Sequence, residues 1–154
     1  MTSSLHRNQG GVMLLEAMIG ILIFSLGVLA LVAMQAVSTS NVSNARFRSE
    51  AAFLANEIIS QAWVDRGDLT NPTSSNLVRF YKWPGGGTAV ANWVTKVNQL
   101  LPQSDIYPPT ITQSPILGMP RGVQLTVTIQ WKAPDALTPS NHVAIGFVSH
   151  PAEQ

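Results

Sequence analysis

The chain has 154 residues, a formal net charge of +1 and no cysteine. This length fits one small domain with an accessory element rather than two full domains. The lack of cysteine excludes disulfides, thiol catalysis and cysteine-ligated metal sites. The nine lysines and arginines are scattered along the chain, so the sequence predicts no concentrated basic face and no direct nucleic-acid partner.

Residues 17–34, AMIGILIFSLGVLALVAM, form an apolar run whose only polar residue is Ser25. A helix rises about 1.5 Å per residue, so about 18–20 residues cross the hydrocarbon core of a bilayer. The Ser25 hydroxyl can donate to a carbonyl of its own helix and then needs no other partner. The run predicts a membrane-spanning helix that occupies residues 12–37.

Two other kinds of segment share this composition. A helix buried on all sides in a soluble core is disfavoured, because a chain of this size could hardly cover it. A secretory signal peptide would use Arg7 as its basic start, but its apolar region usually has about 7–15 residues and ends at small residues. Here the run is longer, VAMQAVS is a poor cleavage sequence, and Glu16 would lie inside the apolar region.

Glu16 stands at the start of the apolar run, where an unpaired carboxylate costs a few kcal/mol. A free α-amino group is the obvious partner for an acid this near the chain start. If the chain were cleaved after Gly11, Val12 would carry that amine and Glu16 would be the fifth residue of the mature chain. Pairing between the Glu16 carboxylate of one copy and the amine of its neighbour would neutralise both charges and set the axial register of two packed helices.

The stretch GGVMLLEAMIGILIFSLGVLALVAMQA, residues 10–36, resembles the class III signal of type IV prepilins. That signal is a short hydrophilic leader ending in glycine, then a hydrophobic residue, then glutamate at mature position five, then an apolar helix. Residues 1–11 match the leader, with Gly11 before the cut. Val12 matches the residue that becomes N-terminal and N-methylated, and Glu16 matches the acid. Within the family, the helix sequence is especially similar to the PilV-type minor pilins, the type IV pilus modification proteins.

This resemblance implies processing, partners and location. Prepilin peptidase would cleave between Gly11 and Val12 and methylate Val12. Other minor pilins, the major pilin and the inner-membrane pilus assembly machinery would be the remaining partners. The leader would face the cytoplasm, and the C-terminal domain would lie in the periplasm after a single pass through the bacterial inner membrane.

The function implied by the resemblance is priming of type IV pilus assembly, with the subunit able to stay at the tip of the pilus. The pilus, or fimbrium, would serve twitching motility, attachment or DNA uptake. Many major pilins carry a proline in the first helix, whereas the first proline of this chain is Pro72. This difference fits a minor subunit better than the bulk of a filament.

Residues 38–66 are more polar but keep a helical period. Apolar residues recur every three or four positions and form one stripe, which comprises Phe47, Ala51, Leu54, Ile58 and Ala62. Arg66 and Gly67 provide a helix end. The sequence therefore predicts one helix from Val12 to Arg66, roughly 80 Å long, whose second half needs a single partner surface.

Residues 67–154 are predicted to form a small globular domain that contains a short helix at residues 89–101. Thr88 is a plausible N-cap and Pro102 ends the helix. The apolar face of this helix comprises Val90, Trp93, Val97 and Leu100. Before it, NLVRFYKW is predicted as a short strand or an extended connector, and PGGG at residues 84–87 is a break.

Antiparallel strands are predicted near residues 110–113, 122–132 and 142–149. The middle strand alternates strictly, with one apolar face that comprises Val123, Leu125, Val127, Ile129 and Trp131. In the last strand, Val143, Ile145 and Phe147 are predicted to face the core. Proline near the first strand favours an edge position.

A sheet of three or four strands can lie on the stripe of the long helix, which gives an α+β fold with a pilin-like layout. The elements follow from the sequence pattern, whereas the pilin arrangement follows from the resemblance.

No pattern of an active site stands out. The three histidines, His6, His142 and His150, lack the spacing of a metal site. The glycines at 85–87 are not followed by a phosphate-loop lysine, and no nucleophile-elbow motif occurs. We therefore predict no catalytic residue, no metal and no cofactor, and interpret the protein as a substrate of enzymes rather than an enzyme.

The aromatic residues of the connectors are expected in the core, with a contact surface for another subunit as the alternative. They are Phe80, Tyr81, Trp83 and Tyr107.

Two further functions remain open from the residues alone. A pseudopilin of a type II secretion system would have much the same N-terminus, although the longer domain and the helix sequence favour the pilus. A single-span anchored protein with an outward-facing binding domain would keep its N-terminus at Met1, and it leaves Glu16 unexplained.

Overall fold

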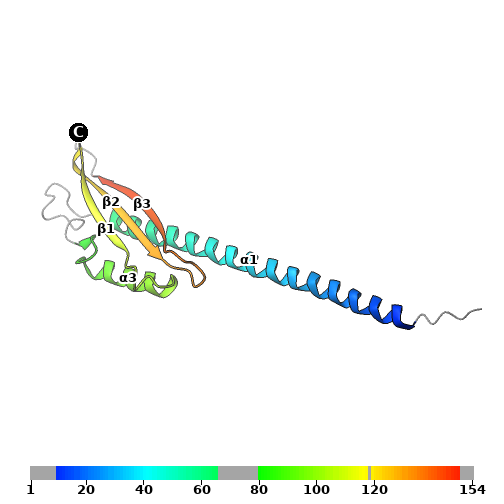
Figure 1. Ribbon diagram of the computed structural model, residues 1–154. Helices are drawn as coiled ribbons and strands as arrows, with labels where there is room; N and C mark the ends of the chain where they lie inside the picture. The colour runs from blue at the N-terminus through cyan, green and yellow to red at the C-terminus, as the bar shows by residue number, and fades with distance from the viewer. Residues whose placement is uncertain (1–9, 66–79, 118, 150–154) are drawn as a thin grey trace, which may run out of the picture. The chain divides into compact units, whose positions relative to one another are not determined.

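The computed structural model describes residues 10–65, 80–117 and 119–149, and the side chains of residues 12–65, 80–117 and 122–149. In chain order the elements are α1 (Gly10–Val64), α3 (Thr88–Leu100), β1 (Thr110–Ile116), β2 (Met119–Trp131) and β3 (Ser140–Ser149) (Figure 1). The fold is α+β, a long N-terminal helix with a small antiparallel sheet, as predicted at this level. Contacts divide the chain into two units, Met1–Val42 and Ser43–Gln154, and α1 contributes to both.

The helix α1 runs without interruption for 55 residues. It begins at Gly10, two residues before the predicted start, and ends at Val64; the predicted end at Arg66 and Gly67 lies outside the described residues. The Ser25 hydroxyl donates to the carbonyl of Ile21 at 2.7 Å. The prediction that the Ser25 hydroxyl donates to a carbonyl of its own helix is therefore confirmed.

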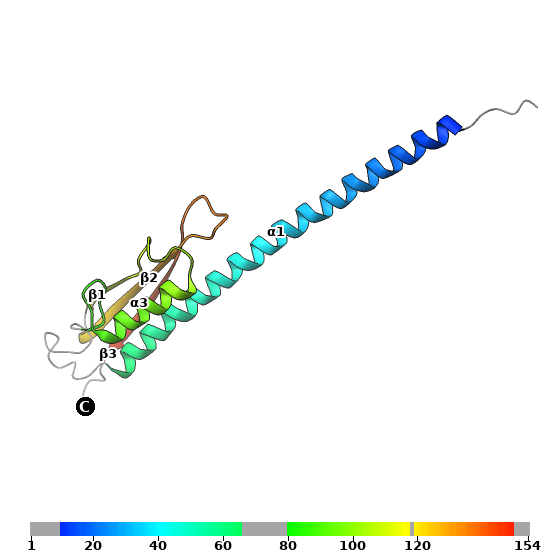
Figure 2. The same ribbon diagram turned by 90° about the horizontal axis from the view of Figure 1, so that it is seen from below.

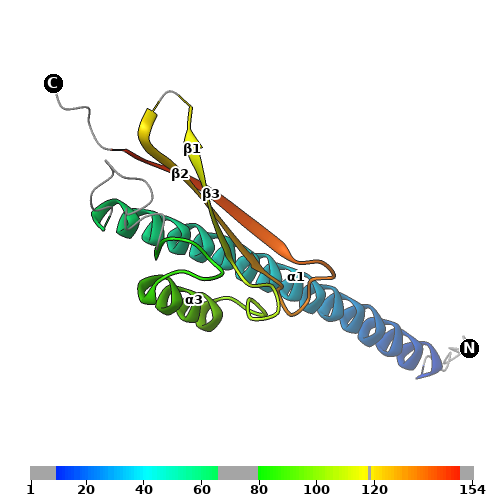
Figure 3. The same ribbon diagram turned by 90° about the vertical axis from the view of Figure 1, so that its left-hand side faces the viewer.

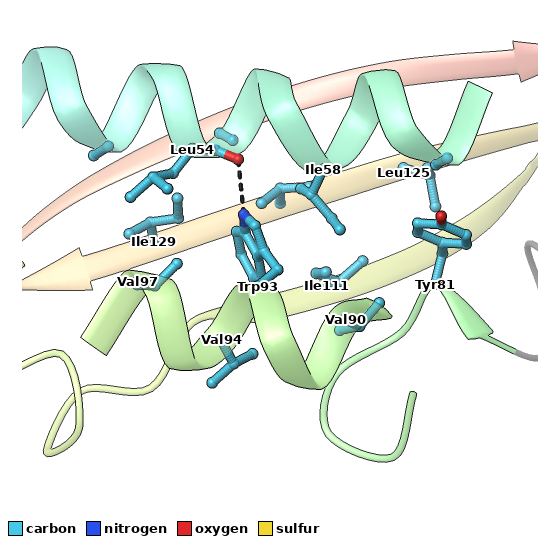
Figure 4. Close-up of a cluster of buried hydrophobic side chains, with 14 of the residues drawn as sticks. Leu54, Ile58, Tyr81, Val90, Trp93, Val94, Val97, Ile111, Leu125 and Ile129 are labelled. Carbon is cyan, nitrogen blue, oxygen red and sulfur yellow. Dashed lines mark hydrogen bonds between the residues drawn. The ribbon is translucent and has the colours of Figure 1, made fainter. Parts of the chain in front are cut away.

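In the second unit, the end of α1 and the helix α3 lie side by side on one face of the sheet (Figures 2 and 3). The predicted stripe of α1 is confirmed, because Ala51, Leu54, Ile58 and Ala62 are at most 1% exposed, and Phe47 packs against the core from its margin. Figure 4 shows side chains of α1, α3 and the sheet meeting in this core. Burial of these apolar side chains supplies most of the domain's stability.

The cap of α3 differs from the prediction. Gly87, not Thr88, is the N-cap, and Thr88 is the first helical residue. The Gly87 carbonyl accepts from the N–H of Ala91 at 3.0 Å. A Cβ on Gly87 would lie 2.8 Å from a ring carbon of Phe80, so the packing of that ring leaves room only for glycine.

The C-terminal end of α3 corrects one core residue. Val90, Trp93 and Val97 are buried as predicted, but Leu100 is 40% exposed and Leu101 is 2% exposed. The prediction for Leu100 was wrong because the helix stops before Leu101, which is extended (φ −113°, ψ 130°) and turns into the core. Pro102 follows, and a residue before proline avoids the helical region.

The sheet has the order β1-β2-β3 with antiparallel pairing throughout. The predicted edge position of the first strand is confirmed, and this strand extends beyond residue 113 to Ile116. The alternation of β2 is also confirmed, because its predicted inward residues are all buried, at 9% exposure or less. These residues are Val123, Leu125, Val127, Ile129 and Trp131.

The predicted facing of β3 is wrong. Val143, Ile145 and Phe147 are 49%, 54% and 55% exposed, whereas Gly146 and Val148 of the alternate set are buried. The reason is the close approach of α1: a Cβ on Gly146 would lie 2.4 Å from Cγ2 of Ile59. At position 146 only glycine fits under the helix, so the set that contains Gly146 and Val148 faces inward and Val143, Ile145 and Phe147 point away from the helix.

Candidate functional site

The first part of α1 carries a continuous apolar surface. Every side chain from Val12 to Thr39 is exposed in the single chain, with Phe24 and Met34 at 72%. Among the described residues, α1 is long and apolar enough to cross a membrane, and none of its most apolar window is buried. A core helix of a soluble protein is mostly buried, so this exposure argues against that alternative, while a signal sequence passes the same test of length and composition.

These side chains need a covering that the described part of the chain does not provide. Full burial of a Val, Leu, Ile, Phe or Met side chain is worth about 1.5–3 kcal/mol. Exposed apolar patches larger than a few hundred Å² mark membrane or protein contacts. The first half of α1 is therefore suited to lipid or to the apolar faces of neighbouring helices.

Glu16 is the one ionisable residue between Val12 and Ala45. Its side chain is exposed, and no ion pair or hydrogen bond joins it to another described residue. Val12 lies four residues earlier in the same helix, so the two residues share one face one turn apart. A carboxylate on an apolar helix that has no partner among the described residues is costly in apolar surroundings unless another group pairs with it.

Gly10 and Gly11 are the first two residues of α1, so the Gly11–Val12 peptide bond lies in the first turn. The N–H groups of that turn have no carbonyl partner in the helix. Cleavage after Gly11 and methylation of Val12 stay predictions. The rest of the leader, including His6 and Arg7, lies outside the described residues.

A second polar feature lies where α1 ends. The Tyr81 hydroxyl donates to Oδ2 of Asp65 at 2.5 Å. Tyr81 is 2% exposed, and burial, together with the hydrogen bond to Asp65 and its negative charge, raises the pKa of Tyr81. The sequence pattern did not predict this pair, because the two residues are 16 positions apart and no local pattern links them.

A pocket of about 250 Å³ opens beside this pair. Its lining comprises Asp65, Phe80, Tyr81, Gly87, Thr88 and Ala89. The acid in its wall is already engaged by Tyr81, and no group of three metal-ligating side chains occurs in the described parts of the chain. This pair therefore joins the end of α1 to the following connector. The prediction that the chain is not an enzyme stays a prediction.

The other connector aromatics have mixed surroundings. Phe80 is 40% exposed, while Trp83 and Tyr107 are half-buried. Trp83 pairs with Ile111 of β1 through two backbone hydrogen bonds of 3.2 Å. Trp83 therefore lies along the outer edge of β1, whereas residues 76–79 of the predicted strand or connector lie outside the described residues. His142 is half-buried on β3, and His150 is outside the described residues.

One ion pair crosses from α3 to α1. Nζ of Lys96 contacts Oε1 of Glu57 at 2.7 Å and lies 5.7 Å from the centre of the Phe53 ring. Both charged side chains are at least one-third exposed, so the pair adds little stability. It lies on the surface and forms no site with other ionisable residues in the described part of the domain.

Comparison with protein-family models, characterised proteins and solved structures finds no match.

Proposed function

We propose that this chain is a minor type IV pilin of the PilV type that helps to prime pilus assembly. Prepilin peptidase cleaves it between Gly11 and Val12 and methylates Val12. The mature chain waits in the bacterial inner membrane with a single pass and with its C-terminal domain in the periplasm. There it meets other minor pilins, the major pilin and the assembly machinery, and it enters the pilus with them.

The observation that carries this proposal is the division of α1 into two environments. Side chains from Val12 to Thr39 have no cover from the described residues, whereas the stripe from Ala51 to Ala62 is buried under the sheet. A helix of this kind suits a subunit whose first half lies in lipid and later among neighbouring helices. The α+β layout, a long helix with a small antiparallel sheet, is compatible with a pilin.

Glu16 supplies the chemistry of assembly in this proposal. Cleavage after Gly11 creates an α-amino group on Val12, one helical turn from the Glu16 carboxylate. In apolar surroundings a lone charge of either sign is costly, and a pair is much less so. The amine of one subunit and the Glu16 carboxylate of the next therefore attract each other and fix how far one helix slides along another. Close packing of the apolar helices adds to this contact.

The first experiment is the mass of the intact protein and of its N-terminal peptide, extracted from its native membrane. The proposal expects a chain that begins at methylated Val12. A chain that still begins at Met1, in cells with active prepilin peptidase, would contradict it. That result would favour the single-span anchored binding protein.

The charge pair is tested by Glu16→Gln and Glu16→Ala, with Glu50→Gln as the matched control on the same helix. Both Glu16 variants should still be cleaved, but their methylation or their incorporation into pili should fall at least tenfold. Glu50→Gln should behave as the unaltered chain. Normal pilus numbers in the Glu16 variants would refute the pairing.

A deletion strain separates the pilus from a type II secretion system, whose pseudopilins share this N-terminus. Loss of surface pili supports the proposal. Loss of exported enzymes with normal pili would assign the chain to secretion instead.

A further inference from the structure

Two loops of the second unit carry large apolar side chains that point into solvent. The loop between β2 and β3, residues 132–139, carries Leu137, which is 95% exposed. The loop between α3 and β1, residues 101–109, carries Ile106, which is 64% exposed. Single exposed apolar residues are ordinary on a protein surface, so the place of these two in the fold decides whether they act together.

The two loops lie at the same end of the unit. The N–H of Lys132 donates to the carbonyl of Pro102 at 3.0 Å, which joins the loops just after β2 and α3 end. Figures 1 and 2 show both loops beyond the C-terminal ends of α3 and β2. The two exposed apolar residues therefore belong to one end of the domain.

Backbone hydrogen bonds hold the shape of each loop. The N–H of Tyr107 donates to the carbonyl of Gln103 at 3.1 Å, which closes the turn that contains Ile106. The N–H of Ala136 donates to the carbonyl of Ala133 at 3.0 Å, directly before Leu137. A side chain presented from a closed turn loses less conformational freedom on contact than one on an open loop.

The helix α1 enters the unit at this same end. Figure 4 shows Leu54 of α1 at the end of the core that holds Ile129 and Val97, which lie near the C-terminal ends of β2 and α3. Tyr81 lies at the opposite end, toward which α1 runs before it stops at Val64 (Figure 4). The turns of α1 that precede Leu54 are therefore nearest to the two loops.

Chain length limits how far this end can lie from a membrane that the apolar part of α1 crosses. The second unit begins at Ser43, six positions after Val37, where the predicted span ends. Six residues cover about 9 Å as a helix and at most about 22 Å when fully extended. Headgroups fill about 5–8 Å of that distance. The entry point of the unit therefore stays near the bilayer surface in any arrangement of the two units.

The charges around this end cancel. Residues 43–50 and the two loops together contain three cations and three acids, which are Arg46, Arg48 and Lys132, with Glu50, Asp105 and Asp135. A surface without net charge is neither strongly attracted to anionic lipids nor repelled by them. A contact between this end and a bilayer would therefore be carried by apolar side chains.

We infer that this end of the domain leans on the bilayer that α1 crosses, with the side chains of Leu137 and Ile106 inserted among the lipid headgroups. The presence of that membrane rests on the proposed function. Apolar side chains gain free energy when they leave water for the boundary between headgroups and acyl chains. Tyr107, half-buried beside Ile106, is a residue type that is enriched at this depth.

Two side chains bind a membrane only weakly, but this domain never leaves the membrane surface. The anchor holds both loops close to the headgroups, so the contact forms at a high effective concentration. The domain of a subunit that waits in the membrane is thereby held against the bilayer. Entry into a pilus would break the contact.

The lack of cysteine in the chain allows one fluorescent label at a time. Leu137→Cys and Ile106→Cys are each labelled with NBD in the full chain and reconstituted in phosphatidylcholine vesicles, with or without a lipid that carries a doxyl quencher near its headgroup. Leu117→Cys is the matched control, because Leu117 is a fully exposed leucine just after β1, at the opposite end of the sheet. We expect quenching at positions 137 and 106 to be at least threefold that at position 117. Equal quenching at positions 137 and 117 would overturn the inference.

Lipid charge and protein dilution separate a lipid contact from other contacts. Quenching at position 137 should stay within twofold when a quarter of the lipid is phosphatidylglycerol, because this end has no net charge. It should also stay within twofold over a tenfold range of protein-to-lipid ratio. Quenching that requires phosphatidylglycerol, or that is lost on dilution because it needs a second copy, would overturn the inference.

A second variant removes one of the two apolar side chains. Leu137→Asn is added to the chain labelled at Ile106→Cys, and quenching should fall at least twofold. Tryptophan fluorescence should be unchanged, because Leu137 is 95% exposed and its loss leaves the core intact. Leu117→Asn is the matched control and should leave quenching as it was. Unaltered quenching with Leu137→Asn would contradict the joint contact of the two loops.

A label at Leu26→Cys, near the middle of the apolar run, tests the membrane segment itself with a doxyl group deep in the acyl chain. Quenching at position 26 without any excess at position 137 removes only the loop contact. No quenching at position 26 removes the membrane span, and both proposals fail with it. The N-terminal peptide mass from native membranes separates the remaining case: a chain that still begins at Met1 but shows the loop contact removes only the pilin proposal.

Discussion

Replacement of Gly146 by alanine should weaken the domain through one steric conflict. The strand β3 passes so near α1 that a Cβ on Gly146 would lie 2.4 Å from Cγ2 of Ile59, and 3.3 Å and 3.4 Å from two further carbons of that side chain. Carbon atoms in contact normally lie about 3.5–4.0 Å apart. The first of these distances is short by more than about 1 Å, so either Ile59 or the strand has to move.

The magnitude follows from how little Ile59 can yield. A β-branched side chain in a helix has one strongly preferred χ1 rotamer, so rotation away from the strand is costly. Inserted methyl groups in packed interiors typically cost about 1–3 kcal/mol. We expect Gly146→Ala to lower the free energy of unfolding by this amount.

The assay is urea unfolding of the full chain in mild detergent, followed by tryptophan fluorescence. In an Ile59→Ala background the new methyl group has space, so Gly146→Ala should then cost less than about 0.5 kcal/mol, and the double-mutant cycle should show coupling of about 1 kcal/mol or more. Gly27→Ala, where nothing lies within 4 Å, is the matched control and should not weaken the domain. An unfolding free energy for Gly146→Ala within about 0.5 kcal/mol of the original chain would refute the steric argument.

Three further predictions concern polar contacts of the domain. Because the pKa of Tyr81 is raised in the folded chain, its neutral form contributes its full stability below the unfolded pKa near 10. This contribution is lost as the pH rises through the folded pKa. Urea titrations from pH 8 to 11 should show the start of that loss in the original chain and not in Tyr81→Phe. Trp93→Phe removes the buried hydrogen bond of 2.9 Å from Nε1 to the Leu54 carbonyl. The free energy of unfolding should fall by about 0.5–1.5 kcal/mol beyond the effect of the change in packing. An unchanged free energy of unfolding in Trp93→Phe would show that this bond adds nothing. Lys96→Ala should lower the free energy of unfolding by less than about 1 kcal/mol, because the ion pair with Glu57 is partly exposed. The effect should be smaller still in 1 M salt. A larger loss of stability that does not depend on salt would indicate that Lys96 acts through packing rather than charge.

Several features of this protein follow from local sequence pattern. The apolar run around Ser25 is evident from its length and composition alone. The buried stripe of α1 and the inward set of β2 each repeat with a single period, and one face of each element is clearly more apolar than the other. A helix or strand with one apolar face has one way to bury it. The placement of Glu16 four residues after Val12, on the same helix, is likewise read from the sequence.

Other features depended on where separate elements meet. The Tyr81–Asp65 hydrogen bond, the glycine cap of α3 and the burial of Leu101 in place of Leu100 arise from contacts or chain turns that local periodicity does not encode. Each involves a residue that leaves a regular element or that touches a residue far along the chain. Propensity and periodicity describe elements one at a time and say little about such positions.

The facing of β3 shows the limit most clearly. Val143, Ile145 and Phe147 form one apolar set, while Ala144, Gly146 and Val148 form another, so alternation alone allowed either set to face the core. The sequence by itself determined that β3 is a strand and that α1 has an apolar first half and an amphipathic second half. Only the tertiary structure decided which side of β3 is inside, because the nearness of Ile59 leaves space for glycine and none for a larger side chain.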